Sequence, residues 1–259
     1  MYIDTHCHIN SQDLRLDARA VITRARDAGV RKMVIVGCDF EDSCEALGLA
    51  EDFSQFGLYA TIGIHPHEAK RYGAVPEAFT RLVQNKRVVA VGEIGLDYHY
   101  DHSPRADQHR MFELQLEFAR EHNMPVVLHI REAMDEAMAI LKYYRDLKLL
   151  FHCYSGGLAH LDRVIEMEAM CSFGGAVTWT GKASHELREV VRKIPIDNLL
   201  AETDSPYMTP VPFRGKRNEP AYITYVYETI ARERNMSLPE LEAKIAGNAQ
   251  RFFAWEDEQ

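Results

Sequence analysis

The stretch PVVLHIREAMDEAMAILKYYRDLKLLFH, residues 125–152, contains the repeating unit that decides the fold. It opens with an apolar run, residues 125–128, that ends directly in His129. An amphipathic segment with helical spacing follows, and a second apolar run, residues 149–151, ends directly in His152. A strand, a helix and a strand in this order predict a βαβ unit with two parallel strands.

The same alternation continues along the chain in both directions. Strands are expected at residues 1–4, 32–37, 58–62, 88–92, 125–128, 149–151, 170–173 and 198–201. Helices are expected at residues 17–28, 42–52, 76–84, 108–122, 133–144, 158–167, 186–193, 223–235 and 238–246. Because parallel crossovers are right-handed, such units predict an α/β fold that closes into a TIM (β/α)8 barrel. If residues 170–173 were not a strand, an open sheet would be the alternative.

Length and composition agree with one globular barrel. The chain has 259 residues, and α/β barrels of about 250 residues commonly form one domain, so we expect a single domain over residues 1–259. Hydrophobic residues make up 46% and charged residues 27%, which excludes a disordered, collagen-like or coiled-coil chain. A formal net charge of -9 argues against non-specific coating of nucleic acid, but it leaves room for a local basic pocket.

The cysteines and the first residues of the chain predict a protein of the reducing cytoplasm. Five cysteines are scattered without CxxC spacing, so neither a disulfide framework nor a zinc ribbon is expected. The chain opens on an expected strand rather than on a leader, and no apolar run approaches the roughly 18 residues of a membrane span. We therefore expect a cytoplasmic enzyme that does not contact membranes and is a monomer or weak oligomer.

Six metal-ligating side chains lie at or just beyond the ends of expected strands. They are His6, His8, Glu93, His129, His152 and Asp204. In an extended segment, residues two apart face the same side, so His6 and His8 can point at one ion. Four imidazoles and two carboxylates are enough ligands for two divalent ions, which a bridging carboxylate can hold about 3.5–4 Å apart. This mixed ligand set leaves Zn, Mn and Mg as alternatives.

Taken singly, each of these residues also has a structural explanation. A pair of histidines two apart can lie on a surface, and a histidine at a strand end can be an ordinary core residue. Glu93 could cap a helix or form an ion pair. Asp204 could form a turn before Pro206, and Glu202 is a competing carboxylate. The prediction of a metal centre therefore depends on all six converging at the carboxyl-terminal rim of one barrel.

Longer motifs extend this pattern over nearly the whole chain. They are DTHCH (4–8), GIHPH (63–67), GEIGLDYH (92–99), HIREA (129–133), HCYSG (152–156), ETDSP (202–206), RGKRNEP (214–220) and GNAQRFF (247–253). In these motifs the chain resembles the TatD family of metal-dependent deoxyribonucleases, within the amidohydrolase-like barrel hydrolases. The resemblance implies that His6 and His8 bind a first metal ion, which Asp204 completes while acting as general base. It also implies that His129 and His152 bind a second ion and that Glu93 bridges the two.

The resemblance further implies a 3′–5′ exonuclease that acts on DNA ends, with RNA as a further substrate. Basic residues near the expected mouth of the barrel fit an anionic substrate, because an Arg fork can grip phosphate. The predicted substrate-binding residues are His65, Arg131, Arg214, Lys216 and Arg217. Alternatively, the basic residues of the last loop are solvated charges, and His65 is a turn residue before Pro66. Tyr98, His99 and Tyr154 either stack on bases or pack at the rim.

Three functions remain open from the sequence. The first is a metal-dependent nuclease. The second is a hydrolase of another ester or amide bond, such as a lactone, a cyclic amide or the ester of a misacylated tRNA, that uses the same dinuclear site. The third is a catalytically silent scaffold, which would be expected to have lost Asp204 or a histidine ligand; the sequence retains them.

Overall fold

Eight parallel strands form the centre of the computed structural model, which describes residues 1–255; residues 256–259 of the expected domain lie outside the described residues. The strands are β1 (Tyr2–Cys7), β2 (Val30–Val36), β3 (Leu58–Ile62), β4 (Val88–Asp97), β5 (Val126–Arg131), β6 (Leu149–Phe151), β7 (Met170–Phe173) and β8 (Leu199–Ala201). They lie side by side in sequence order. Because β7 pairs with both β6 and β8, the open-sheet alternative loses its basis.

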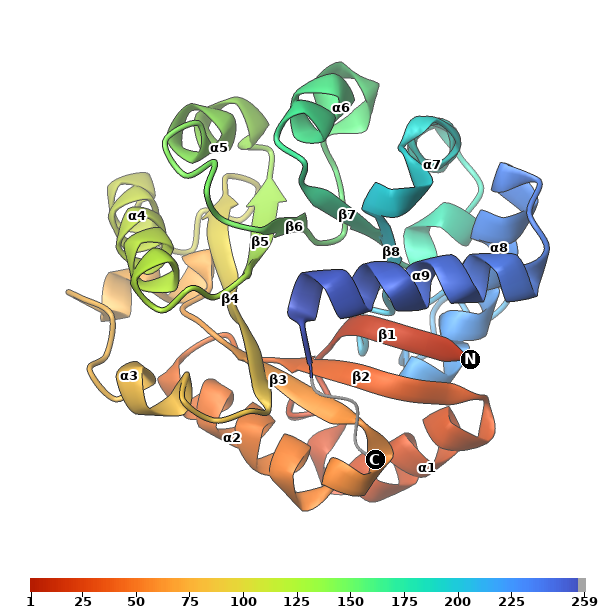
Figure 1. Cartoon of the computed structure of the whole chain (residues 1–259), viewed down its shortest axis with the longest axis horizontal. Coiled ribbons are helices and arrows are strands. Elements are labelled where there is room, and N and C mark those ends of the chain that lie inside the picture. Colours follow the sequence, from red (N-terminus) through yellow and green to blue (C-terminus); the bar gives the residue numbers. More distant parts are fainter. Residues whose placement is uncertain (256–259) are drawn as a thin grey trace.

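The segment after β8 closes the ring against β1. An isolated parallel bridge joins Cys7 and Ser205. The Asp204 amide donates to the carbonyl of His6 at 2.9 Å, and the His8 amide donates to the carbonyl of Ser205 at 2.7 Å. Figure 1 shows the helices arranged around this ring of strands. The prediction of an α/β TIM barrel is confirmed.

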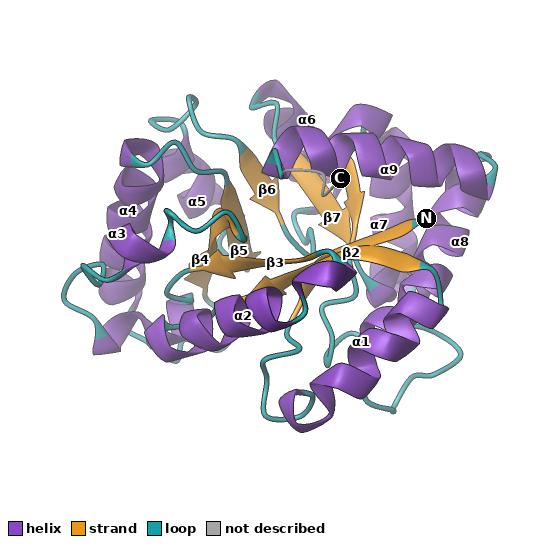
Figure 2. Ribbon diagram, turned by 60° about the horizontal axis from the view of Figure 1, so that its bottom comes forward, coloured by secondary structure: helices purple, strands orange, loops and turns teal. Residues whose placement is uncertain are grey.

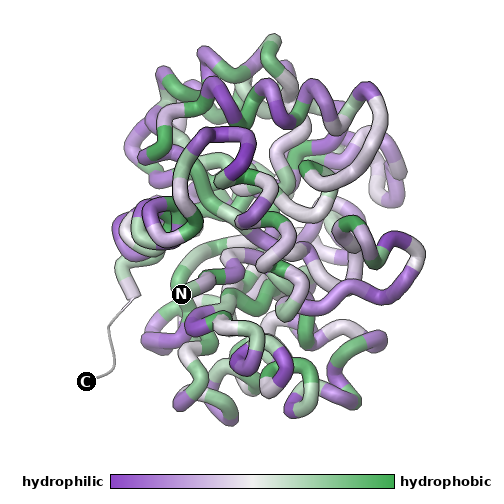
Figure 3. The backbone as a smooth tube through the Cα atoms, turned by 90° about the vertical axis from the view of Figure 1, so that its right-hand side faces the viewer, coloured by the Kyte–Doolittle hydropathy of each residue, from purple (hydrophilic) through white to green (hydrophobic). Residues whose placement is uncertain are grey.

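The helices cover the outside of the barrel (Figure 2). They are α1 (Ala18–Asp27), α2 (Phe40–Asp52), α3 (Phe79–Leu82), α4 (Arg105–Glu121), α5 (Met134–Leu141), α6 (Gly157–Glu166), α7 (Lys182–Lys193), α8 (Ile223–Arg234) and α9 (Leu238–Phe253). Hydrophilic and hydrophobic residues alternate along their turns, as expected for helices with one buried stripe (Figure 3). Among residues 1–255, none of the helices combines the length and apolar character that a membrane crossing requires.

Helices α3 and α9 differ most in length from the sequence prediction. The segment expected at residues 76–84 forms only the single turn of α3, because the chain must turn again to enter β4. In contrast, α9 continues through Gly247 to Phe253, whereas the predicted helix ends at residue 246. Its later turns bury Phe252 and Phe253, and this packing outweighs the weak helix propensity of one glycine.

Strands β1 and β5 extend three residues beyond their predicted ends, to Cys7 and Arg131. Strand β4 extends five residues beyond its predicted end at Gly92. It pairs with β5 as far as Asp97, with an irregularity in the register between Val91 and Ile94. A side chain at Gly95 would place its Cβ 2.1 Å from the carbonyl oxygen of His129, so glycine permits the close approach of β5. The glycines that looked like a strand end therefore allow the strand to continue through a crowded region.

Helix α9 crosses the amino-terminal end of the barrel (Figure 1). The Asn248 amide donates to the carbonyl oxygen of Leu199, at the start of β8, at 2.8 Å. After the helix, the Trp255 ring stacks on Tyr59 of β3 with ring centroids 5.0 Å apart. This end is thus closed by packed side chains, and the opposite, carboxyl-terminal end is the one that carries the histidines.

Candidate metal centre

The six predicted ligands converge at the carboxyl-terminal end of the barrel. His6 lies on β1 and His8 just after it, Glu93 on β4, His129 on β5, His152 directly after β6 and Asp204 three residues after β8. The register irregularity of β4 falls at Glu93, and such irregularities commonly re-aim a side chain. The structure therefore brings together side chains from widely separated parts of the sequence.

The first group of donor atoms comprises His6, His8, Asp204 and one oxygen of Glu93. His6 Nε2 lies 3.1 Å from His8 Nε2. Asp204 Oδ1 lies 3.7 Å from His6 Nε2 and 3.4 Å from His8 Nε2. Glu93 Oε2 lies 3.5 and 3.8 Å from the same two nitrogens. Ligand bonds of about 2.0–2.1 Å place the donors of a tetrahedral zinc ion about 3.3–3.4 Å apart, so this group fits an ion.

The second group forms around the other oxygen of Glu93. Glu93 Oε1 lies 2.7 Å from His129 Nδ1 and 2.6 Å from His152 Nε2. These two nitrogens are 3.3 Å apart. The two oxygens of one buried carboxylate thus face different sets of imidazoles. A carboxylate that bridges two metal ions requires this arrangement.

The charges in this cluster suit cation binding. Burial would raise the pKa of the Glu93 carboxyl, but His152 and His6 outweigh it and hold that pKa well below its usual range. Burial likewise opposes ionisation of Asp204, yet its hydrogen bond with His8 lowers its pKa. Burial lowers the pKa of His6. Burial would also lower the pKa of His152, but Glu93 and Glu202 outweigh it and raise that pKa well above its usual range. The carboxylates are thus ionised, as metal binding requires, and an ion that binds at His152 would displace a proton from the imidazole.

His65, predicted to contact substrate phosphate, lies at the inner edge of the second group. Its Nε2 is 3.8 Å from Glu93 Oε1, and its ring is 4.4 Å from that of His129. Burial lowers its pKa well below the usual range, so the ring is neutral at neutral pH. His65, Glu93 and His129 together have the spacing of a metal-ligating group. The position therefore suits a phosphate contact next to an ion and also direct ligation.

Asp97 was not singled out from the sequence, although it lies in the quoted motif GEIGLDYH. Its Oδ2 lies 3.0 Å from His129 Nε2 and 3.0 Å from His67 Nε2. Because Nε2 of His129 is held by this carboxylate, Nδ1 of the same ring faces Glu93. Carboxylates that orient a ligating histidine from behind are a regular feature of metal sites.

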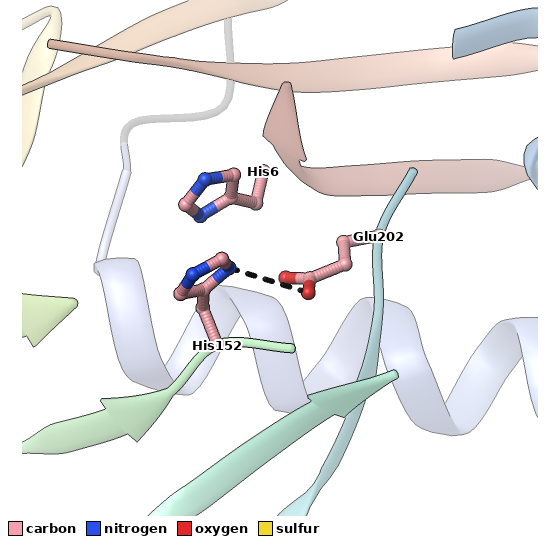
Figure 4. A group of neighbouring side chains, drawn as sticks. All are labelled: His6, His152 and Glu202. Atoms are coloured by element: carbon pink, nitrogen blue, oxygen red, sulfur yellow. Dashed lines mark ion pairs between the residues drawn. The ribbon is translucent and has the colours of Figure 1, made fainter. Parts of the chain in front are cut away.

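Glu202, the competing carboxylate, lies behind His152 (Figure 4). Its Oε1 accepts a hydrogen bond from the Cys153 amide at 2.6 Å and lies 3.5 Å from His152 Nδ1. Its Oε2 accepts from the Ser172 hydroxyl at 2.5 Å. The ring of His6 stacks on that of His152, with centroids 3.9 Å apart. Both oxygens of Glu202 are thus engaged by protein donors, and within the described residues the carboxylate approaches His152 Nδ1 without a hydrogen bond. His6, His152 and Glu202 together also have the spacing of a metal-ligating group, so Glu202 remains a competing carboxylate.

The predicted basic residues are distributed unevenly around the centre. A cavity of about 680 Å³ opens beside the six residues and is lined by Arg131, Trp179 and Asp204, among others. Arg214 lies over the Trp179 ring at 3.8 Å, at the edge of this cavity. Lys216 lies 5.6 Å from the Phe213 ring. Arg131 therefore lies at the cavity itself, and Lys216 packs within its own loop.

Arg217 is held away from the cavity by another segment. Its guanidinium donates to the carbonyl of Asp13 and lies 3.7 Å from Asp17 Oδ2. These contacts attach the loop after β8 to the segment before α1. The structure thus gives Arg217 a position that holds this loop in place, and its role in substrate binding stays a prediction.

Two of the three aromatic residues considered for base stacking pack at the rim. Tyr154 is only 3% exposed, and its hydroxyl donates to the Gly157 carbonyl. Tyr98 is partly buried, the guanidinium of Arg105 covers its ring at 3.9 Å, and its hydroxyl contacts His109 Nε2. His99 is more exposed and lies 2.7 Å from the Glu132 carboxylate. The rim-packing alternative therefore describes Tyr154 and Tyr98 better than stacking does.

Comparison with known proteins identifies the family. The sequence model of the family described as TatD related DNase matches residues 3–254. The chain belongs to this TatD family. It is 39% identical over 256 residues to the uncharacterized metal-dependent hydrolase YabD of Bacillus subtilis, with 98% of this chain and 99% of the relative covered. The resemblance read from the motifs is confirmed, and the chain is a metal-dependent hydrolase.

Other TatD relatives carry a more specific description. The 3′-5′ ssDNA/RNA exonuclease TatD of Pantoea vagans is 36% identical over 262 residues, with 96% of this chain and 98% of the relative covered. The solved structure of the TatD homologue YJJV from Escherichia coli superposes with a TM-score of 0.88 at 30% identity and covers 98% of both chains. A TatD family hydrolase from Entamoeba histolytica, at 22% identity, shares the fold with a TM-score of 0.86 over 97% of both chains.

Proposed function

We propose that this TatD-family hydrolase is a divalent-metal-dependent 3′–5′ exonuclease of single-stranded DNA, with RNA as a further substrate. The observation that carries the proposal is the bridging position of Glu93, whose two oxygens face two separate groups of imidazoles. Relatives named 3′-5′ ssDNA/RNA exonuclease at 33% and 36% identity support the choice of substrate.

In this proposal the six converging residues hold two ions. His6, His8 and Asp204 would hold one ion, His129 and His152 would hold the other, and Glu93 would serve both. Bound at these positions, divalent ions lower the pKa of water and offset negative charge on a phosphodiester. Zn, Mn and Mg all accept nitrogen and oxygen ligands of this kind.

Residues of the chain would accept the proton of the attacking water and bind the substrate. Asp204 is 14% exposed beside the cavity, so its carboxylate can accept a proton from the attacking water. Arg131 lines the same cavity and can grip a phosphate through two of its donors. A volume of about 680 Å³ lies within the range of roughly 300–1,000 Å³ typical of small-molecule sites, so it can admit one terminal nucleotide.

The experiment is a digestion of single-stranded oligonucleotides labelled at the 5′ end. With Mn, Mg or Zn present, the protein should shorten them stepwise from the 3′ end, and a chelator should stop it. A phosphorothioate at the 3′-terminal linkage should block digestion, whereas one at the 5′-terminal linkage should not. Matched RNA oligonucleotides test the further substrate.

Asp204→Asn should be inactive in this assay, and Asp135→Asn provides the matched control. Asp135 is an exposed carboxylate that pairs with Arg163 at 2.8 Å and is not one of the six predicted ligands. Intact oligonucleotides under every metal condition, together with cleavage of a lactone, a cyclic amide or a misacylated tRNA ester, would replace the nuclease with the other hydrolase function. If only the phosphorothioate at the 5′-terminal linkage blocks digestion, the enzyme degrades from the 5′ end and the proposed 3′–5′ polarity is wrong.

A further inference from the structure

Three tyrosines are the exposed large aromatic side chains within residues 1–255. Tyr100 is 51% exposed, Tyr143 is 71% exposed and Tyr207 is 58% exposed. Tyr100 follows β4 and Tyr207 follows β8, so both lie at the carboxyl-terminal rim with the candidate metal centre. Tyr143 follows α5, which runs back toward the other end of the barrel. Tyr100 and Tyr207 therefore lie at the same end of the barrel as the candidate metal centre.

These two tyrosines lie on opposite sides of the centre. The strands follow one another in sequence order around the ring, so β4 lies across the barrel from β8 (Figure 1). Glu93 reaches the centre from β4, and Asp204 reaches it from the segment after β8. A chain that spans from Tyr100 to Tyr207 therefore passes over the residues that would hold the ions.

Tyr207 is held rigidly beside the first group of donor atoms. Its amide donates to the Asp204 carbonyl at 2.8 Å, and its carbonyl accepts from the Asn218 side chain at 2.6 Å. Its ring meets that of His8 edge to face, with centroids 6.0 Å apart. The backbone is therefore fixed to the ligand-bearing segment while more than half of the side chain faces solvent.

Tyr100 is attached to the second group in the same manner. Its amide donates to Asp97 Oδ1 at 2.9 Å, and the other oxygen of Asp97 holds His129. The Arg131 guanidinium lies 4.8 Å from the Tyr100 ring, and the His102 ring lies parallel to it at 5.4 Å. The His99 and His67 rings meet the Tyr100 ring edge to face at 4.7 and 5.6 Å, yet Tyr100 stays 51% exposed. A base that stacks on Tyr100 would take the place of one of these partners, and the Arg131 guanidinium beside it suits the adjoining phosphate.

We propose that Tyr100 and Tyr207 each stack one unpaired base, so that the enzyme holds a single strand across the metal centre with the scissile phosphate between them. Arg131 beside Tyr100 and Arg214 over Trp179 supply local positive charge for the backbone of a strand, although the chain as a whole has a net charge of -9. Aromatic faces stack on any base, and the bases of an intact duplex are not free to do so. The inference rests on the proposed nuclease function and assigns its preference for single strands to two residues.

The test compares Tyr100→Ala and Tyr207→Ala with the matched control Tyr143→Ala. Binding of a short fluorescein-labelled oligothymidylate is measured by fluorescence anisotropy in EDTA, which needs no bound metal and no turnover. Each rim variant should raise the Kd roughly five- to a hundredfold, the range for loss of one stacked base. The double variant should combine both losses because the two sites are far apart. Tyr143→Ala should bind as the unaltered protein does.

Oligonucleotides with one abasic position separate stacking from a merely structural role. If Tyr207 stacks one base, removal of that base should weaken binding to the unaltered protein but not to Tyr207→Ala. Tyr100 should couple in the same way to a different position, and Tyr100→Phe and Tyr207→Phe should retain binding. Rim variants that bind like Tyr143→Ala, or that couple to no position, overturn the inference while the nuclease function stands. An unaltered protein that neither binds nor cleaves nucleic acid overturns both.

Discussion

The two ends of the barrel are built from opposite kinds of side chains. At the carboxyl-terminal end, buried histidines and carboxylates crowd around Glu93, and the Nδ1 atoms of His6 and His152 have no hydrogen-bond partner within the described residues. At the amino-terminal end, the Trp255 ring stacks on those of Tyr59 and Phe253. Buried polar groups oppose folding unless they are paired, whereas stacked aromatic rings favour it.

This difference indicates how the chain divides stability from chemistry. A cluster of buried titratable groups is costly without a cation to organise it, so its retention points to ligand binding. The aromatic closure beneath it supplies stabilising contacts and no reactive group. Substitutions at the two ends should therefore separate loss of activity from loss of stability.

The largest effect is expected at the carboxyl-terminal end. Asp204→Asn should lower turnover by about 10²–10⁴-fold or more, because it removes a proton acceptor and a charged ligand. The melting temperature should stay near that of the unaltered protein, since the side chain contributes little packing. Steady-state digestion and thermal melting measure the two quantities. A variant that still digests DNA at the normal rate would remove Asp204 from the mechanism.

The next largest effect is expected at the amino-terminal end and should have the opposite character. Trp255→Ala removes a side chain that is 3% exposed and should lower the free energy of unfolding by about 3–5 kcal/mol. At temperatures where the variant is folded, kcat should be unchanged. Urea denaturation and the same digestion assay test this. A loss of activity without a loss of stability would contradict the division between the ends.

A smaller effect is expected one step behind the metal centre. Asp97→Asn should weaken metal binding by about 10- to 100-fold, because the amide orients His129 less firmly than the carboxylate does. Competition with a chromophoric chelator measures this affinity. Asp101→Asn is the matched control, because Asp101 is exposed and pairs with Arg105 at 2.9 Å. If Asp97→Asn binds the metal as tightly as Asp101→Asn does, Asp97 does not act through His129.

The sequence predicted the barrel well because the signal for each strand is local. A short apolar run flanked by amphipathic helices is readable without knowledge of the fold. The predicted end of β4 was wrong because Gly92 and Gly95 look like turn residues. In the structure these glycines instead allow β5 to approach β4 closely. Likewise, α9 passes Gly247 because of tertiary packing, which no local pattern reveals.

The sequence also predicted the main residues of the candidate site, but not the contacts around them. The six residues stood out because metal-ligating side chains recur at strand ends, which in a parallel barrel all meet at one rim. Asp97 was missed because only the structure shows its contact with His129. The position of Arg217 depends on Asp13, which lies 204 residues away in the chain. Exposure distinguished Tyr100 and Tyr207 from their buried neighbours, and sequence does not report exposure residue by residue.

The central claim is that Glu93 shares its two oxygens between two metal ions. The most direct test is a crystal structure of protein loaded with zinc or manganese, with anomalous difference maps collected at the absorption edge of that metal. Two peaks about 3.5–4 Å apart are expected, one on each side of the Glu93 carboxylate. A single peak, or peaks distant from Glu93, would contradict the account.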